Sequence, residues 1–119
     1  NTCKNPPLEE KMYEPTPEAF VYLKTDRVMH RVLVNEILYI ESWKDYVKLF
    51  LTGERTLLVK QSISALENML SNHQFLRVHR SYIVSLKSIT SYDKTNVYVQ
   101  QTEIPIGRLY KQTVMSQLA

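Results

Sequence analysis

Arginine and histidine side chains concentrate in one short stretch, residues 76–84, which reads LRVHRSYIV. Three of its members, Arg77, His79 and Arg80, are cationic or can become so. An arginine guanidinium is a planar fork that donates paired hydrogen bonds to phosphates and to base edges, and a neutral imidazole can donate and accept at once. Because apolar residues flank this group on both sides, we expect them to anchor a short basic turn that is pressed against DNA.

Two further places combine basic residues with the context of a turn. Trp43-Lys44-Asp45 lies between two predicted strands, and Gly107-Arg108 follows the last predicted strand, with Lys111 one turn later. Three separate loops can converge on one partner only if the strands align their ends. Composition alone does not establish that alignment.

Catalytic and metal-binding patterns are missing from the sequence. The three histidines, His30, His73 and His79, have no metal-ligand spacing. The two glycines are isolated, so there is no glycine-rich phosphate loop, and no serine lies in a nucleophile elbow. We therefore expect no enzyme activity, no cofactor and no metal.

Length and charge fit one domain with a polyanionic partner. The chain has 119 residues and is 44% hydrophobic. Residues 1–19 carry net charge −2, whereas residues 20–119 hold 13 Lys and Arg against 8 Asp and Glu, a net charge of +5. A single cysteine, Cys3, excludes an internal disulfide and fits a reducing compartment, so we expect a cytoplasmic protein without a membrane segment. Because the chain begins with Asn1, we expect a fragment of a longer protein.

The elements that position these turns are mostly short strands. Proline recurs in residues 1–17, which are predicted to be a linker or arm. The predicted strands are Phe20–Lys24, Arg27–Val34, Ile37–Glu41, Tyr46–Thr52, Arg55–Lys60, Leu76–His79, Ile89–Tyr92, Asn96–Gln100 and Glu103–Ile106. Their close spacing favours antiparallel hairpins.

Two helices are predicted as well. The first begins near Ile63 and ends near His73; Ser64 and Glu67 form a possible capping box, with Ser62 as the alternative cap. The second closes the chain, because Tyr110, Val114 and Leu118 recur on one helical face. The predicted class is therefore mainly β.

In this order, the segments ILYIESWKDYVKLFL, FLRVHRSYIVSLKSI and IPIGRLYK closely resemble the LytTR family of DNA-binding domains, which are output domains of bacterial response regulators. The resemblance covers roughly residues 20–118, and its most specific part is the block from Arg77 to Ser81. It implies an elongated antiparallel β-sandwich of short strands with small helices, formed by residues 18–119. It also implies that loops enter successive major grooves of duplex DNA.

The resemblance carries DNA-contacting roles to particular residues. They are Lys44, Asp45 and Tyr46 in the first loop, His79, Arg80 and Ser81 in the second, and Arg108 with Lys111 in the third. Val47 alternates with Leu49 and is expected to be buried. Implied partners are double-stranded DNA with repeated half-sites, a receiver domain preceding this chain, and a second copy in a homodimer.

Other roles stay open for several of these residues. His79 can brace its turn through the backbone instead of contacting phosphate, and Asp45 can cap its turn. Arg77 either contacts DNA or makes an internal ion pair, with Glu41 as the candidate partner. Trp43 is expected to pack beside the first loop, and the tyrosines at 39, 82, 92 and 98 are expected in the core or half-buried.

Two alternative functions also remain. The eight tyrosines could stack the bases of single-stranded nucleic acid or RNA. The basic turn could instead dock an acidic peptide in a protein-interaction module.

Overall fold

The computed structural model describes residues 19–71 and 74–118, which form ten strands and two α-helices. The strands are β1 (Phe20–Thr25), β2 (Val28–Leu33), β3 (Ile37–Trp43), β4 (Tyr46–Leu51), β5 (Arg55–Val59), β6 (Phe75–His79), β7 (Tyr82–Ser85), β8 (Ile89–Tyr92), β9 (Asn96–Val99) and β10 (Thr102–Pro105). The helices are α1 (Ile63–Met69) and α2 (Lys111–Leu118), and short 3-10 turns precede β3, β8 and α2.

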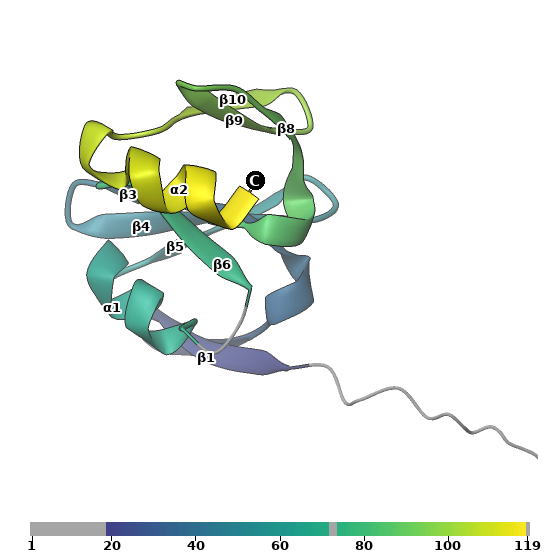
Figure 1. The fold of residues 1–119 in the computed structure, drawn as a ribbon. Coiled ribbons are helices and arrows are strands. Elements are labelled where there is room, and N and C mark those ends of the chain that lie inside the picture. Colours follow the sequence, from purple (N-terminus) through teal and green to yellow (C-terminus); the bar gives the residue numbers. More distant parts are fainter. Residues whose placement is uncertain (1–18, 72–73, 119) are drawn as a thin grey trace, which may run out of the picture.

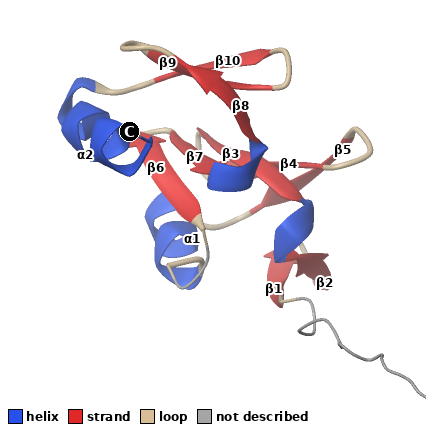
Figure 2. Cartoon of the chain, turned by 45° about the vertical axis from the view of Figure 1, so that its right-hand side comes forward, coloured by secondary structure: helices blue, strands red, loops and turns tan. Residues whose placement is uncertain are grey.

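The strands form three antiparallel sheets. A central sheet has the order β5-β4-β3-β7-β6, the hairpin β1-β2 lies on one side of it, and the sheet β10-β9-β8 lies on the other (Figure 1). Helix α1 lies on the side of the β1-β2 hairpin, and α2 on the side of the three-stranded sheet (Figure 2). The central sheet is therefore covered on both faces.

Two hydrophobic clusters follow from this layering. One lies between the central sheet, α1 and the β1-β2 hairpin, and contains Ile40, Leu49 and Leu66. The other lies between the central sheet, the three-stranded sheet and α2, and contains Val78, Val97 and Val114. In β4, Val47, Leu49 and Leu51 enter the first cluster while Phe50 packs against the second, as period-two alternation requires.

The predicted class, a mainly antiparallel β fold of short strands with two small helices, is confirmed. The prediction lacked β7, which follows directly after the basic turn. The cap of α1 is Ser62, whose hydroxyl accepts a hydrogen bond from the Ala65 amide at 3.0 Å, so the proposed Ser64–Glu67 capping box is wrong. Helix α1 ends at Met69; the predicted end at His73 and the arm 1–17 lie outside the described residues.

Within the described ranges, no helix is both long enough and apolar enough to cross a membrane.

Candidate nucleic-acid interface

The first basic turn joins β3 to β4. Trp43 pairs with Tyr46, which leaves Lys44 and Asp45 as a two-residue connection. Both side chains and that of Tyr46 are exposed, whereas Val47 is fully buried as expected. The Lys44 backbone has φ +59°, the left-handed region that L-residues rarely adopt. The turn therefore projects a lysine and a carboxylate from a strand that the core holds in place.

The second basic turn joins β6 to β7 and lies beside the first. His79 pairs with Tyr82, so Arg80 and Ser81 form the connection. Because β7 runs antiparallel to β3, the start of β7 meets the end of β3, and the Ser42 amide donates to the Ser81 carbonyl at 2.8 Å. The two hairpin turns consequently lie at the same end of the central sheet.

The third segment is held against the end of β6. The Gly107 amide donates to the Val78 carbonyl at 2.8 Å, and a Cβ added to Gly107 would lie 3.4 Å from His79 Cδ2. A depression of about 210 Å³ is lined by His79, Arg80 and residues 107–110. Arg80 and Arg108 thus border one surface hollow. We call residues 43–46, 79–82 and 107–111 the turn cluster.

The backbone of the second turn is braced by two of its own side chains. The Ser81 amide donates to His79 Nδ1 at 3.0 Å. Because Nδ1 accepts this bond, the proton of neutral His79 lies on Nε2, which is the donor left for a ligand. Arg77 donates to the carbonyls of His79 and Arg80 at 2.8 and 2.6 Å.

The ion pair of Arg77 differs from the expected one. Its partner is Glu67 on α1, at 2.6 Å, and not Glu41. Glu41 instead accepts a hydrogen bond from the Tyr82 hydroxyl at 3.1 Å. Burial, and then the Glu41 carboxylate, raise the pKa of Tyr82, so this phenol stays protonated as a donor.

The exposed charges of the turn cluster are mainly positive. Lys44, Arg80, Arg108 and Lys111 stand against Asp45 alone. Among the described residues, none of these five side chains makes a hydrogen bond or an ion pair. The positive charge of this surface would complement an anionic partner.

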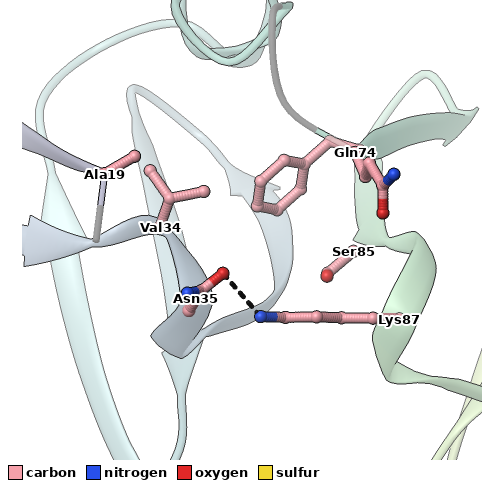
Figure 3. A pocket seen from close by; sticks show the side chains of 7 residues that line it. Ala19, Val34, Asn35, Gln74, Ser85 and Lys87 are labelled. Carbon is pink, nitrogen blue, oxygen red and sulfur yellow. Dashed lines mark hydrogen bonds between the residues drawn. The ribbon is translucent and has the colours of Figure 1, made fainter. Parts of the chain in front are cut away.

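Two other side chains, Lys87 and Tyr39, lie outside the turn cluster. Lys87 donates to Asn35 at 2.6 Å, beside a pocket that Ser85 also lines (Figure 3). This pocket lies at the end of β7 opposite to the second turn. Tyr39 is buried and stacks on Phe50 at 4.2 Å.

The remaining aromatic side chains divide between surface and core. Tyr82 and Tyr98 are half-buried as expected, but Tyr92 is 43% exposed. Trp43 is 55% exposed, so most of its ring is free of the packing expected beside the first loop.

Sequence reasoning missed two residues that shape the site. Glu67 was assigned to a cap, and its pairing with Arg77 joins positions ten residues apart that no local pattern connects. The sequence predicts that Gly107 lies in the third turn but does not reveal its role, which is to let the third segment approach His79 because it has no side chain. The only sequence signal was the rarity of glycine, since the chain has two.

Cationic turns lie together at one end of the central sheet, and such a clustered basic surface is typical of nucleic-acid-binding domains. Comparison with known proteins specifies the class further. The protein-family model of the LytTr DNA-binding domain matches residues 27–119. The chain therefore belongs to the LytTR family of DNA-binding domains. The resemblance seen in the sequence is therefore confirmed.

Two individual proteins are similar to the chain. An uncharacterised response regulatory protein of Vibrio cholerae serotype O1 is 28% identical over 102 residues, which are 77% of this chain and 39% of the relative. The chain therefore spans well under half of that relative. A solved LytTr DNA-binding domain from Bacillus cereus, described as part of a methyl-accepting/DNA response regulator, has a TM-score of 0.70 at 23% identity. That match covers 87% of this chain and 99% of the solved one, and it shows a shared fold.

Proposed function

We propose that residues 18–119 bind double-stranded DNA in a sequence-specific way through the turn cluster, and that they control transcription as the output domain of a two-component response regulator. The observation that carries this proposal is the shared hollow between Arg80 and Arg108, next to the Lys44 turn. Three segments distant in sequence thereby offer one cationic surface. Family membership supports DNA as the partner.

The side chains divide into two kinds of contact. Arg108 and Arg80 read base edges in the major groove, because a guanidinium can donate two hydrogen bonds to guanine O6 and N7. Lys44, Lys111, Ser81 and the Nε2 proton of His79 contact phosphates, which fix the register of the protein on the duplex. Asp45 accepts from a cytosine amino group, and Tyr46 lies at the rim of the first turn.

The proposal extends to the longer assembly of the full protein. A receiver domain precedes this chain in the full protein, and its phosphorylation controls DNA binding. Two copies bind repeated half-sites as a homodimer. The response regulatory relative supports this arrangement, since the part that matches this chain leaves most of its length for other domains.

The experiment begins with selection of a tight-binding duplex from a random pool. Arg108→Ala should then lower affinity for the selected duplex by about 1–3 kcal/mol, with a smaller loss on a scrambled duplex. Lys111→Ala should weaken both duplexes alike and reduce the slope of log K against log salt by about 0.9. Lys87→Ala is the control, because Lys87 bonds Asn35 at the opposite end of β7. Equal loss from Arg108→Ala on both duplexes would contradict base reading.

A second candidate is binding of single-stranded nucleic acid. Trp43 and Tyr46 are 55% and 41% exposed on either side of Lys44, and exposed aromatics beside cations stack unpaired bases. Tighter binding to a single strand than to the same sequence as a duplex, in one anisotropy series, would favour this candidate.

A further inference from the structure

Arg77 lies where three segments meet: helix α1, the second turn and the third segment. Its guanidinium uses Nε on the His79 carbonyl, Nη2 on the Arg80 carbonyl and Nη1 on the Glu67 carboxylate, at 2.8, 2.6 and 2.6 Å. The same group lies 5.7 Å from the centre of the Tyr110 ring, two residues after Arg108. One side chain therefore contacts α1, the second turn and the third segment.

The burial of this side chain separates it from the exposed arginines. The Arg77 side chain is 11% exposed, whereas Arg80 and Arg108 are exposed. Its donors are already engaged with protein oxygens, and its aromatic neighbour covers part of the guanidinium face. Few of its atoms remain for a ligand.

We infer that Arg77 is a positioning residue for DNA recognition, which sets Arg80 and Arg108 relative to each other without contacting DNA itself. The inference rests on the proposed function of the turn cluster. Two carbonyls of the second turn converge on one guanidinium, so the path of the chain through Arg80 is fixed by that group. The contact between the Arg77 guanidinium and the Tyr110 ring fixes the segment that carries Arg108 against the same group.

The planar fork is needed for this role. A guanidinium directs donors from three nitrogens in one plane, whereas a lysine ammonium directs three donors from a single atom. Lysine at position 77 would keep the charge but could not hold both carbonyls and Glu67 together. Because Glu67 is 46% exposed, loss of the pair leaves a carboxylate that water can solvate, so the fold should survive the change.

The experiment compares Arg77→Lys with Arg55→Lys on the selected and the scrambled duplex. Arg55 is a matched control, because its Nε bonds the Thr52 carbonyl at 3.0 Å and its Nη2 pairs with Glu36 at 3.1 Å, away from the turn cluster. Arg77→Lys should lose roughly tenfold in affinity for the selected duplex and roughly threefold or less for the scrambled one, since charge is retained. Arg55→Lys should leave both affinities unchanged.

A second measurement separates positioning from direct contact. In a background that already carries Arg80→Ala and Arg108→Ala, Arg77→Lys should cause no further loss, because its effect passes through those two residues. An undiminished loss in that background would mean that Arg77 reads DNA itself, and the inference would be wrong. It would also be wrong if Arg77→Lys lowers the melting temperature but leaves the ratio of the two affinities at the wild-type value.

Failure of the proposed function gives a different result. If the wild-type protein binds no duplex tightly, the function of the turn cluster is wrong and the comparison of variants has no basis. If the wild type binds and Arg108→Ala loses its preference while Arg77→Lys matches wild type, only the role of Arg77 is overturned.

Discussion

Replacing Lys44 with glycine should strengthen the fold and weaken DNA binding. Lys44 has φ +59°, and the left-handed conformation destabilises an L-residue by about 1–2 kcal/mol. Glycine adopts it freely but has more conformational entropy in the unfolded chain, which offsets about 0.5–1 kcal/mol. Together these ranges give a net gain in the free energy of unfolding of about 0–1.5 kcal/mol, and the central value of about 0.75 kcal/mol corresponds to about 3–6 °C in melting temperature for a domain of this size.

The same change removes a cation from the turn cluster. If Lys44 neutralises one phosphate, the slope of log K against log salt should fall by about 0.9. Two assays are therefore expected to move in opposite directions: thermal unfolding by circular dichroism, and anisotropy titration of a labelled duplex at several salt concentrations. Simple damage to the fold would instead lower both the melting temperature and the affinity for DNA.

Glu54→Gly is the matched control. Glu54 has φ +58° in the turn between β4 and β5, at the far end of β4 from Lys44. It should gain similar stability with no loss of DNA affinity. The reasoning fails if Lys44→Gly binds DNA with an unchanged salt slope, or if Glu54→Gly weakens binding as much. A lower melting temperature for Lys44→Gly would refute the account of its backbone.

Two further predictions concern the third segment and the β8-β9 hairpin. Gly107→Ala should weaken binding to the selected duplex, because the new methyl would lie 3.1 Å from Tyr110 Cδ2 and 3.4 Å from His79 Cδ2 and would push the third segment away from the second turn. An unchanged affinity in titration would count against this close approach. Asp93 accepts hydrogen bonds from the Thr95 and Asn96 amides and the Tyr98 hydroxyl, which hold the pKa of its carboxyl below its ordinary value. Above the pKa that Asp93 has in the unfolded chain, the ionised carboxylate contributes its full stability to the fold, and this stability is lost as the pH falls through the folded-state pKa. Asp93→Asn should therefore flatten the dependence of the free energy of unfolding on pH in the acid range, measured by urea unfolding. An unchanged dependence would argue that these bonds do not favour the ionised carboxylate.

The strands were predictable because their signals are local. Val47, Leu49 and Leu51 alternate with polar or half-buried positions, and this period appears in the sequence before any packing is known. Strand β7 was not predicted because only Arg80 and Ser81 separate it from β6. In the sequence, the two strands therefore look like one apolar run. The start of helix α1 was predicted correctly, but two serines could cap it, and the hydrogen bond from the Ala65 amide identifies Ser62 as the cap.

Exposed cations beside turns were predictable one by one, but their arrangement in space was not. The sequence marks Arg80 and Arg108 as cations near turns, yet their common hollow depends on the Gly107–Val78 hydrogen bond between distant segments. The sequence leaves Arg77 open between a DNA contact and an internal ion pair, and only the positions of the turn carbonyls and of Glu67 show that its donors are bonded within the domain. Long-range pairings of this kind leave no periodic trace in a sequence.

Backbone amide shifts in a titration with the selected duplex show whether the three turns form one DNA-binding surface. The large shifts should fall together on residues 43–46, 79–82 and 107–111, while the β4-β5 turn at residues 52–54 should stay unchanged. Shifts confined to one of the three segments, or centred on the β1-β2 hairpin, would contradict a single surface made from three turns.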